Sequence, residues 1–129
     1  MIQVACAVIF KDGKILVTQR GPAMKQPLLW EFPGGKIEPG ETAENCIARE
    51  LLEELNIEVT LNGRLPDCAY TYPDIAINLV PFIAEFKSGI ITLHEHMKYM
   101  WLSPTELKSL DWAPADIKVV NHILNIPPK

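Results

Sequence analysis

Thirteen consecutive residues after Thr42 contain neither glycine nor proline, and Asn56 follows them. Threonine is a good N-cap residue, and asparagine tolerates the left-handed conformation in which many helices end. The run therefore predicts a helix over residues 42–55. Ile47 and Leu51 belong to an apolar side of this helix, which would pack against a sheet. The chain must therefore build its core around one amphipathic helix near its middle.

The other side of the same helix carries three carboxylates, because Glu50, Glu53 and Glu54 fall within an arc of about 100°. Like charges at these spacings destabilise an isolated helix by roughly 0.2–0.5 kcal/mol per pair. Glutamate is also a good helix former, so a solvated face is the simpler interpretation of these three residues alone. However, Mg²⁺ prefers oxygen ligands and usually sits between carboxylates and substrate phosphates. A turn at Gly34 and Gly35 would bring exposed carbonyls to the same place, which predicts a platform for metal and pyrophosphate.

The rest of the chain alternates short apolar runs with turn signals such as Asp12-Gly13. These runs predict strands over residues 2–10, 14–20, 30–32, 57–61, 75–86 and 98–102, and helices over residues 104–110 and 114–124. Pro81 predicts a bulge or an edge within the strand that contains it. Strands mixed with a few helices, without regular βαβ alternation, predict an α+β sandwich. Because we find no linker or repeat, we expect residues 1–129 to form a single domain.

Charge and cysteine content exclude several classes of protein. A net charge of −4 argues against binding of duplex nucleic acid, which requires a basic face. It allows a small phosphorylated ligand, because a metal ion supplies positive charge locally. Cys6, Cys46 and Cys68 are widely spaced and odd in number, which favours buried thiols in a reducing cytoplasm. The apolar run over residues 2–10 is too short for a membrane span, so we expect no membrane partner. The oligomeric state stays open.

The polar residues around the central helix resemble the Nudix box, G-x5-E-x7-R-E-U-x-E-E-x-G-U, in which U is a bulky aliphatic residue. The match begins at Gly35, continues through Glu41 and Arg49, and fails only at Asn56, which replaces the last glycine. Asparagine is the next best residue for a left-handed helix stop, so this departure should cost little. The chain is therefore identified as similar to Nudix hydrolases.

The resemblance extends beyond the box. Residues 30–38 read WEFPGGKIE, which is close to the segment that precedes the helix in MutT-type members. The tail, with HEH at residues 94–96 and APADI at residues 113–117, is similar to the CTP pyrophosphohydrolase branch of the family. The resemblance implies an α/β/α sandwich around a mixed β-sheet, which agrees with the elements predicted above.

Family resemblance implies roles for the acidic residues. Glu50, Glu53 and Glu54 would coordinate divalent cations together with the carbonyl of Gly34, with Mg²⁺ as the metal and Mn²⁺ as a substitute. Glu53 or Glu54 would also help to activate water. Glu95 would be a further metal ligand or the general base on the attacking water. The alternative for Glu95 is an ordinary exposed glutamate in a loop.

Other residues of the motif are better interpreted as structural or stay unassigned. Glu41 and Arg49 would form an ion pair or hydrogen bond across the box that orients the carboxylates, and Gly35 belongs to the turn. His94 and His96 flank a glutamate, but this segment lacks the third ligand and the helical spacing of a zinc site. We assign no role to these two histidines from the sequence.

Four residues are candidates for contact with the nucleotide. Arg20 matches a nucleotide-contacting position of the family, and Lys36 would reach a phosphate, although each is equally explained as a solvated side chain. Phe32 would form an apolar or stacking wall for the base, or belong to the core like most strand phenylalanines. Asp116 would accept a hydrogen bond from the base, or cap the helix that follows Pro114.

These roles imply a Mg²⁺-dependent pyrophosphohydrolase that attacks the β-phosphorus of a nucleoside triphosphate and releases the monophosphate and pyrophosphate. CTP, dCTP or a modified pyrimidine deoxynucleotide is the expected substrate. An 8-oxo-dGTP diphosphatase that cleanses the nucleotide pool is the alternative, because Asp116 suits either base. A non-catalytic nucleotide-binding module is less favoured, since such modules usually lose the box carboxylates. A weaker alternative is a protein-interaction domain that uses the apolar tail.

Overall fold

The computed structural model describes residues 1–125. In chain order the elements are β1 (Ile2–Lys11), β2 (Lys14–Gln19), β3 (Trp30–Glu31), β4 (Gly34–Lys36), α1 (Ala43–Leu55), β5 (Ile57–Arg64), β6 (Cys68–Thr71), β7 (Ala76–Gly89), β8 (Lys98–Leu102), the 3-10 helix η1 (Pro104–Ser109) and α2 (Pro114–Leu124). Every strand and helix predicted from the sequence is present with similar bounds. Two strands, β4 and β6, lie where the sequence predicts a turn or no element. The predicted domain also includes residues 126–129, which lie outside the described residues.

The described strands form one mixed sheet of eight strands with the central order β3-β2-β1-β7-β5. β1 runs parallel to β7 over most of its length and antiparallel to β2. Asp12 and Gly13 join β1 to β2 with φ values of 52° and 77°. This is the conformation that an Asp-Gly hairpin turn requires. The sheet is therefore mixed, because its central pair is parallel and the other pairs are antiparallel.

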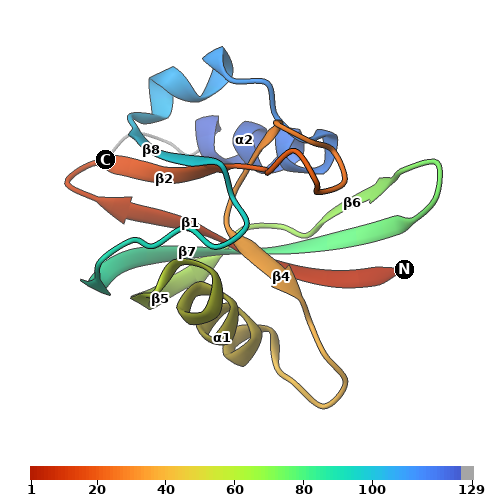
Figure 1. The fold of residues 1–129 in the computed structure, drawn as a ribbon, viewed down its shortest axis with the longest axis horizontal. Helices are drawn as coiled ribbons and strands as arrows, with labels where there is room; N and C mark the ends of the chain where they lie inside the picture. The colour runs from red at the N-terminus through yellow and green to blue at the C-terminus, as the bar shows by residue number, and fades with distance from the viewer. Residues whose placement is uncertain (126–129) are drawn as a thin grey trace.

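Helices cover both faces of this sheet (Figure 1). Successive side chains of a strand point to opposite faces, so one strand can serve two cores. Ala5, Ala7 and Ile9 of β1 pack in the cluster that contains the buried residues of α1. Cys6 and Val8 pack in the cluster that contains the buried residues of α2. The predicted α/β/α sandwich is therefore confirmed.

Local interactions determine where α1 begins and ends. The hydroxyl of Thr42 accepts a hydrogen bond from the amide of Asn45 at 3.0 Å, which caps the first turn and contributes about 1 kcal/mol. Asn56 adopts the left-handed conformation, with φ of 59°. Ile47 and Leu51 are buried against the sheet, and truncation of Leu51 to alanine would cost about 2–5 kcal/mol. The helix is thus held firmly, which fixes the direction of its carboxylates.

The turn predicted at Gly34 and Gly35 is wrong, because both residues belong to strand β4, which pairs with β1. A Cβ atom on Gly34 would overlap the carbonyl oxygen of Ala5. The glycines therefore allow close contact between two strands, and a chain reversal is not their role. The turn before α1 lies further along, at Gly40, where φ is 79°.

The prediction of a bulge or a sheet edge at Pro81 is also wrong, because the structure has instead a change of partner strand on one side of Pro81. Pro81 lies in β7, which is central, and it pairs with Cys6 of β1. On the other side of β7, the partner changes from β5 to β6 at this point. The carbonyl of Pro81 points to this side, where it accepts a hydrogen bond from the amide of Leu65 at 3.0 Å. The nitrogen of Pro81, which carries no hydrogen, points to the same side, between the end of β5 and the start of β6. A central strand tolerates proline here because no partner strand requires its N–H group.

Candidate active site

A pocket of about 440 Å³ lies where β1, β3, β4, α1 and the start of α2 meet the loops before β7 and β8. Its volume is within the range of small-molecule sites. Of the residues that the sequence predicts for the site, those lining it are Arg20, Phe32, Gly34, Gly35, Glu50, Glu54, Glu95 and Asp116. The predicted residues outside its lining are Lys36, Glu41, Arg49 and Glu53. One pocket therefore contains three of the four predicted nucleotide contacts and four of the five predicted metal ligands.

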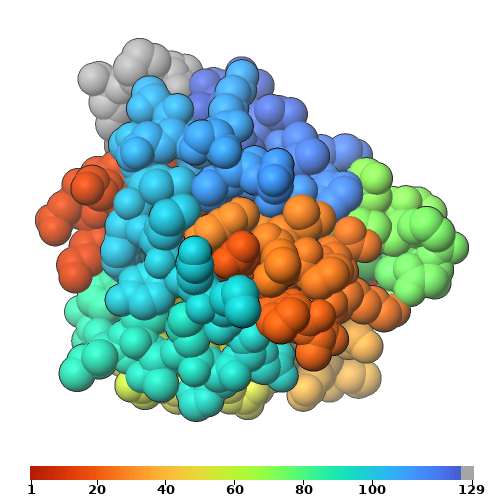
Figure 2. Space-filling model, turned by 45° about the horizontal axis from the view of Figure 1, so that its top comes forward, coloured from red at the N-terminus to blue at the C-terminus, as the bar shows by residue number. Residues whose placement is uncertain are grey.

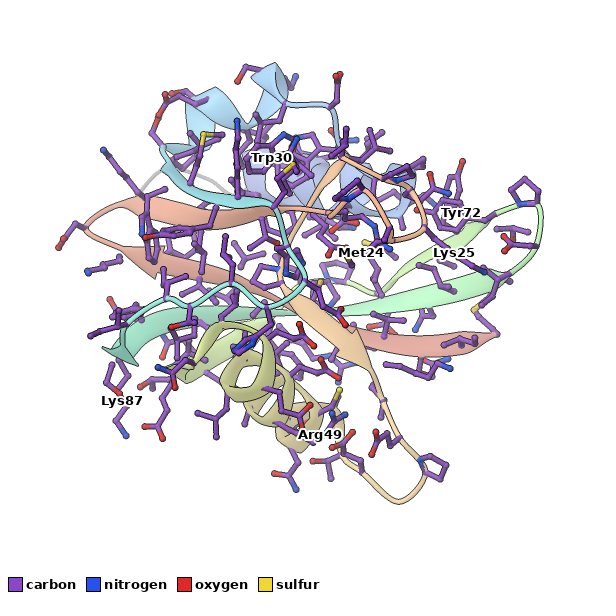
Figure 3. The ribbon with its side chains drawn as sticks, in the orientation of Figure 1. Met24, Lys25, Trp30, Arg49, Tyr72 and Lys87 are labelled. Carbon is purple, nitrogen blue, oxygen red and sulfur yellow. The ribbon has the colours of Figure 1, made fainter. Side chains whose placement is uncertain are left out.

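The rim of the pocket is formed by segments far apart in the sequence. Met24 and Lys25, from the loop after β2, line it together with Tyr72 from the turn before β7. Figure 3 shows these three side chains at one side of the molecule, above β7 and away from Arg49 on α1. In the space-filling view, the orange segment around Lys25 lies between the green β6–β7 hairpin and the cyan segment before β8 (Figure 2). Lys25 also forms an ion pair with Asp74 at 2.7 Å across this rim.

Glycine at position 35 allows the carboxylate of Glu50 to lie against β4. A Cβ atom on Gly35 would overlap the carboxylate carbon and both carboxylate oxygens of Glu50. The side chain of Glu50 is only 15% exposed, and burial raises its pKa. The glycine and the glutamate thus form one unit, in which the missing side chain makes room for a carboxylate that faces the pocket.

Arg49, in the middle of α1, forms hydrogen bonds with the carboxylates of three glutamates. Its guanidinium donates to both oxygens of Glu41, at 2.7 and 3.0 Å. These hydrogen bonds hold the pKa of Glu41 at about 2. Arg49 also donates to Glu50 at 3.0 Å and to Glu53 at 3.3 Å. The predicted contact between Glu41 and Arg49 is therefore present, and its role in orienting the other carboxylates stays a prediction.

Glu54 is the least compensated carboxylate of the pocket. Its Oε2 atom is buried and has no hydrogen-bond partner among the described residues. Burial raises the pKa of Glu54, and the neighbouring charge of Glu95 raises it further. A buried oxygen of this kind is costly unless a cation or a donor satisfies it. The structure therefore contains an acceptor that is available to a ligand.

The carboxylate wall, which we define as Glu50, Glu54 and Glu95, fits a hard divalent cation. Its oxygens are the ligands that Mg²⁺ prefers, and an acceptor on Glu54 is free. Among residues 1–125, no three acidic, histidine or cysteine side chains are already close enough to enclose a metal ion. Mg²⁺ does not require such a cage, because it usually keeps several waters and binds one or two carboxylates plus substrate phosphates. Glu53 lies outside the pocket lining, with its side chain 57% exposed.

Deeper polar side chains form a second group, the inner cluster, defined as Arg20, Glu31, His96 and Asp116. Glu31 accepts a hydrogen bond from Arg20 at 2.6 Å through Oε1. Its Oε2 atom lies 2.8 Å from Nε2 of His96. The sequence assigns no role to Glu31 or His96, since nothing in the local pattern indicates that residues 65 positions apart meet. Arg20 is thus neither free nor simply solvated.

Asp116 is buried and does not cap its own helix. No side chain caps the start of α2, and Oδ1 of Asp116 accepts a hydrogen bond from the amide of Phe32 at 3.0 Å. Burial raises the pKa of Asp116 well above its usual value, and the charge of Glu31 adds to this effect. The ring of Phe32 stacks on Trp112 with centroids 4.8 Å apart, so it belongs to the core and also lines the pocket.

Comparison with known proteins identifies the family. Residues 1–123 match the family described as "NUDIX domain". The chain belongs to the Nudix family. It is 39% identical to the CTP pyrophosphohydrolase of Escherichia coli (strain K12), with 96% of this chain and 92% of that protein covered. It is 35% identical to the 8-oxo-dGTP diphosphatase of Haemophilus influenzae, with 97% of this chain and 93% of that protein covered.

A solved Nudix-type fold agrees with this assignment. The solution structure of the E. coli ORF135 protein superposes with a TM-score of 0.85 at 38% identity, covering 96% of this chain and 89% of that one. The predicted resemblance to Nudix hydrolases of the MutT type is therefore confirmed. The chain is a hydrolase that acts on phosphoric anhydrides.

Nudix hydrolases generally need a divalent metal ion. In this member, the Nudix box begins in β4 and continues through α1, and it brings Gly35, Glu50 and Glu54 into the pocket lining. Glu31, Tyr72 and His96 also line the pocket, outside the box, and the sequence assigns no role to them. The one available signal for Tyr72 is its place in a turn-rich segment before the long apolar strand, which is too general to predict a site. Within the described residues, no helix is long and apolar enough to cross a membrane.

Proposed function

We propose that this protein hydrolyses a nucleoside triphosphate to the monophosphate and pyrophosphate, with CTP or dCTP as the preferred substrate. The observation that carries this proposal is that one pocket joins the carboxylate wall to the buried Asp116 and Phe32. The carboxylate wall suits a metal-bound phosphate chain, and Asp116 with Phe32 suits a base. The similarity to the CTP pyrophosphohydrolase of E. coli supports cytosine as the base.

We propose Mg²⁺ as the metal, with Mn²⁺ as a substitute. Glu50, Glu54 and Glu95 would hold it with the carbonyl of Gly34, and Glu53 would join them through a change of its exposed side chain. Bound Mg²⁺ would neutralise phosphate charge and lower the pKa of water. Lys36 is exposed outside the pocket, so a phosphate contact requires its side chain to extend over the rim.

Proton acceptance from the attacking water falls to a carboxylate of the wall. Glu54 is the best placed of the three candidates Glu53, Glu54 and Glu95, because it lines the pocket and its buried Oε2 atom has no partner in the described chain. Attack of water at the β-phosphorus would break its bond to the α–β bridging oxygen, so the nucleoside monophosphate would leave and the water oxygen would remain in pyrophosphate.

Base recognition would centre on Asp116. The amide of Phe32 donates a hydrogen bond to Oδ1, which leaves Oδ2 and the second lone pair of Oδ1 for a ligand. Burial raises the pKa of Asp116 and so favours its protonated form, which would offer a donor and an acceptor together. Cytosine presents the complementary pair, an amino donor and a ring nitrogen acceptor. Arg20, already paired with Glu31, would contact the nucleotide with its remaining N–H groups.

An 8-oxo-dGTP diphosphatase is the second candidate function. It is favoured by the similarity to the enzyme of that name from H. influenzae. An oxidised guanine also presents donors beside an acceptor, so the carboxyl group of Asp116 suits it as well. We propose a cytoplasmic enzyme in either case, because its three cysteines are buried and free of disulfides.

A panel of nucleotides with Mg²⁺ tests the proposal. CTP, dCTP, 5-methyl-dCTP and 8-oxo-dGTP should be compared by kcat/KM, with release of monophosphate and pyrophosphate as the readout. We expect the highest value for a cytosine nucleotide and loss of all activity when Mg²⁺ is chelated. A higher kcat/KM for 8-oxo-dGTP than for every cytosine nucleotide would select the second candidate. Full turnover in the presence of chelator would contradict both.

A further inference from the structure

We propose that His96 is a positioning residue, which Glu31 anchors so that the preceding loop presents Glu95 to the carboxylate wall. This inference rests on the proposed role of Glu95 as a metal ligand. It gives a role to a histidine that the sequence leaves unassigned, and it connects the inner cluster to the metal site.

Glu31 forms the anchor because its two oxygens serve two different elements. Oε1 accepts from Arg20 at the end of β2, and Oε2 lies 2.8 Å from Nε2 of His96 in the loop before β8. The side chains of His96 and Glu31 are 4% and 16% exposed. Ion pairs and hydrogen bonds at this depth are screened far less than surface pairs. The contact is therefore suited to hold a loop in one position.

The donor in this contact follows from the chemistry of the partner. A carboxylate only accepts hydrogen bonds, so Nε2 of His96 carries the proton that lies between the two side chains. The other ring nitrogen, Nδ1, is buried and has no hydrogen-bond partner among residues 1–125. The contact with Glu31 is thus the one side-chain hydrogen bond that orients this ring within the described chain.

Glu95 has little to fix its own direction. It is exposed, and its side chain makes no hydrogen bond to another described residue. Its backbone is tightly placed, because the carbonyl of Glu95 lies 2.5 Å from where a Cβ of Gly21 would be. On the other side, the amide of Met97 donates to Gln19 at 2.9 Å. His96 lies between these two backbone contacts, so its buried ring decides on which side of the loop Glu95 emerges.

Loss of the anchor should weaken metal binding more than folding. Removal of residues that orient metal ligands typically lowers metal affinity about 10- to 100-fold. Substitution by glutamine or asparagine distinguishes the roles of the two ring nitrogens. The amide nitrogen of glutamine reaches the position of Nε2, whereas that of asparagine reaches the position of Nδ1. His96→Gln should therefore keep the hydrogen bond to Glu31, whereas His96→Asn should lose it.

The test measures Mn²⁺ binding to the full-length protein without nucleotide, by electron paramagnetic resonance of the free ion. We expect His96→Asn to raise the Mn²⁺ Kd about tenfold and His96→Gln to stay within about threefold of the wild type. His94→Gln is the matched control, since His94 is exposed in the same loop, and it should leave the Kd unchanged. Thermal melts of the three variants show whether each is folded. Equal Kd values for His96→Asn and His96→Gln would overturn the proposal.

A double-mutant cycle shows whether His96 acts through Glu95. In the Glu95→Gln background, His96→Asn should change the Mn²⁺ Kd less than twofold, because the ligand that it positions is already lost. An unchanged tenfold effect in this background would overturn the positioning role while leaving Glu95 as a ligand. If Glu95→Gln alone leaves the Kd unchanged, both the metal-ligand role of Glu95 and the inference that depends on it are wrong.

Discussion

The carboxyl group of Asp116 accepts a hydrogen bond from the backbone amide of Phe32 at 3.0 Å, although 84 positions separate the two residues. Two backbone hydrogen bonds support the same junction, from Trp30 to Asp111 and from Ala113 to Trp30, each at 2.8 Å. The start of α2 is thereby fastened to β3, and the proposed base site is a product of this junction. Asp116 consequently affects both stability and substrate choice.

The pH dependence of stability should reveal the buried Asp116. Its folded-state pKa is raised, so its proton contributes stability below the ordinary value of 3.8, and this contribution is lost as pH rises through the raised value. Asp116→Asn keeps an acceptor for Phe32 but cannot ionise. We expect the Tm of the variant minus the Tm of the wild type to increase as pH rises above about 4. A Tm difference that is constant with pH would show that Asp116 ionises normally.

Substrate discrimination should depend on the same residue. Asp116→Ala should lower kcat/KM for the preferred nucleotide by roughly tenfold to a hundredfold, because a buried polar partner of the base is lost. The effect on a poor substrate should be small. The comparison uses CTP, dCTP, 5-methyl-dCTP and 8-oxo-dGTP. Equal losses for all four would limit Asp116 to its structural bond with Phe32.

Removal of a charge from Glu54 should separate stability from activity. Glu54→Gln removes a partly buried charge that repels Glu95, so the Tm of the metal-free protein should rise. Its kcat should fall at least a hundredfold, because a metal ligand and candidate base is lost. Glu53→Gln should cost less, since Glu53 is exposed outside the pocket, and Glu44→Gln is the matched control on the same helix. A Glu54→Gln enzyme within about tenfold of the wild-type kcat would exclude the assigned site.

Gly35 should tolerate no side chain. Gly35→Ala would push a methyl group into the carboxylate of Glu50, which should displace this ligand and raise the Mg²⁺ concentration needed for half-maximal activity about tenfold. Gly63→Ala is the matched control, because no atom lies within 4 Å of its added Cβ. The measurement is a Mg²⁺ titration of activity for each variant. Identical titrations for the two variants would show that Gly35 does not position Glu50.

The sequence predicted best what local interactions determine. The bounds of α1 follow from the capping threonine and from Asn56, and both signals lie within the helix and its flanks. The hairpin at Asp12-Gly13 is equally local. β4 was missed because its pairing depends on β1, and the break at Pro81 depends on the change from β5 to β6. Such features are properties of partner strands, which no local pattern reveals.

In the site as well, the sequence predicted the features that lie within one helix and missed those that depend on tertiary packing. The spacing of the Nudix box placed Glu50 and Glu54 on one helix face, and the structure places them in one pocket. The sequence could not place Glu53 outside the pocket lining, because helical angles alone do not show where the sheet and loops lie. The contact of Glu31 with His96 and that of Asp116 with Phe32 arise from tertiary packing across long separations.

Hydrolysis in ¹⁸O-labelled water tests the central claim most directly. The substrate is the nucleotide with the highest kcat/KM, the metal is Mg²⁺, and the products are analysed by mass spectrometry. Attack at the β-phosphorus predicts one ¹⁸O atom in pyrophosphate and none in the nucleoside monophosphate. Orthophosphate and a nucleoside diphosphate as primary products, or ¹⁸O in the monophosphate, would contradict the proposed reaction.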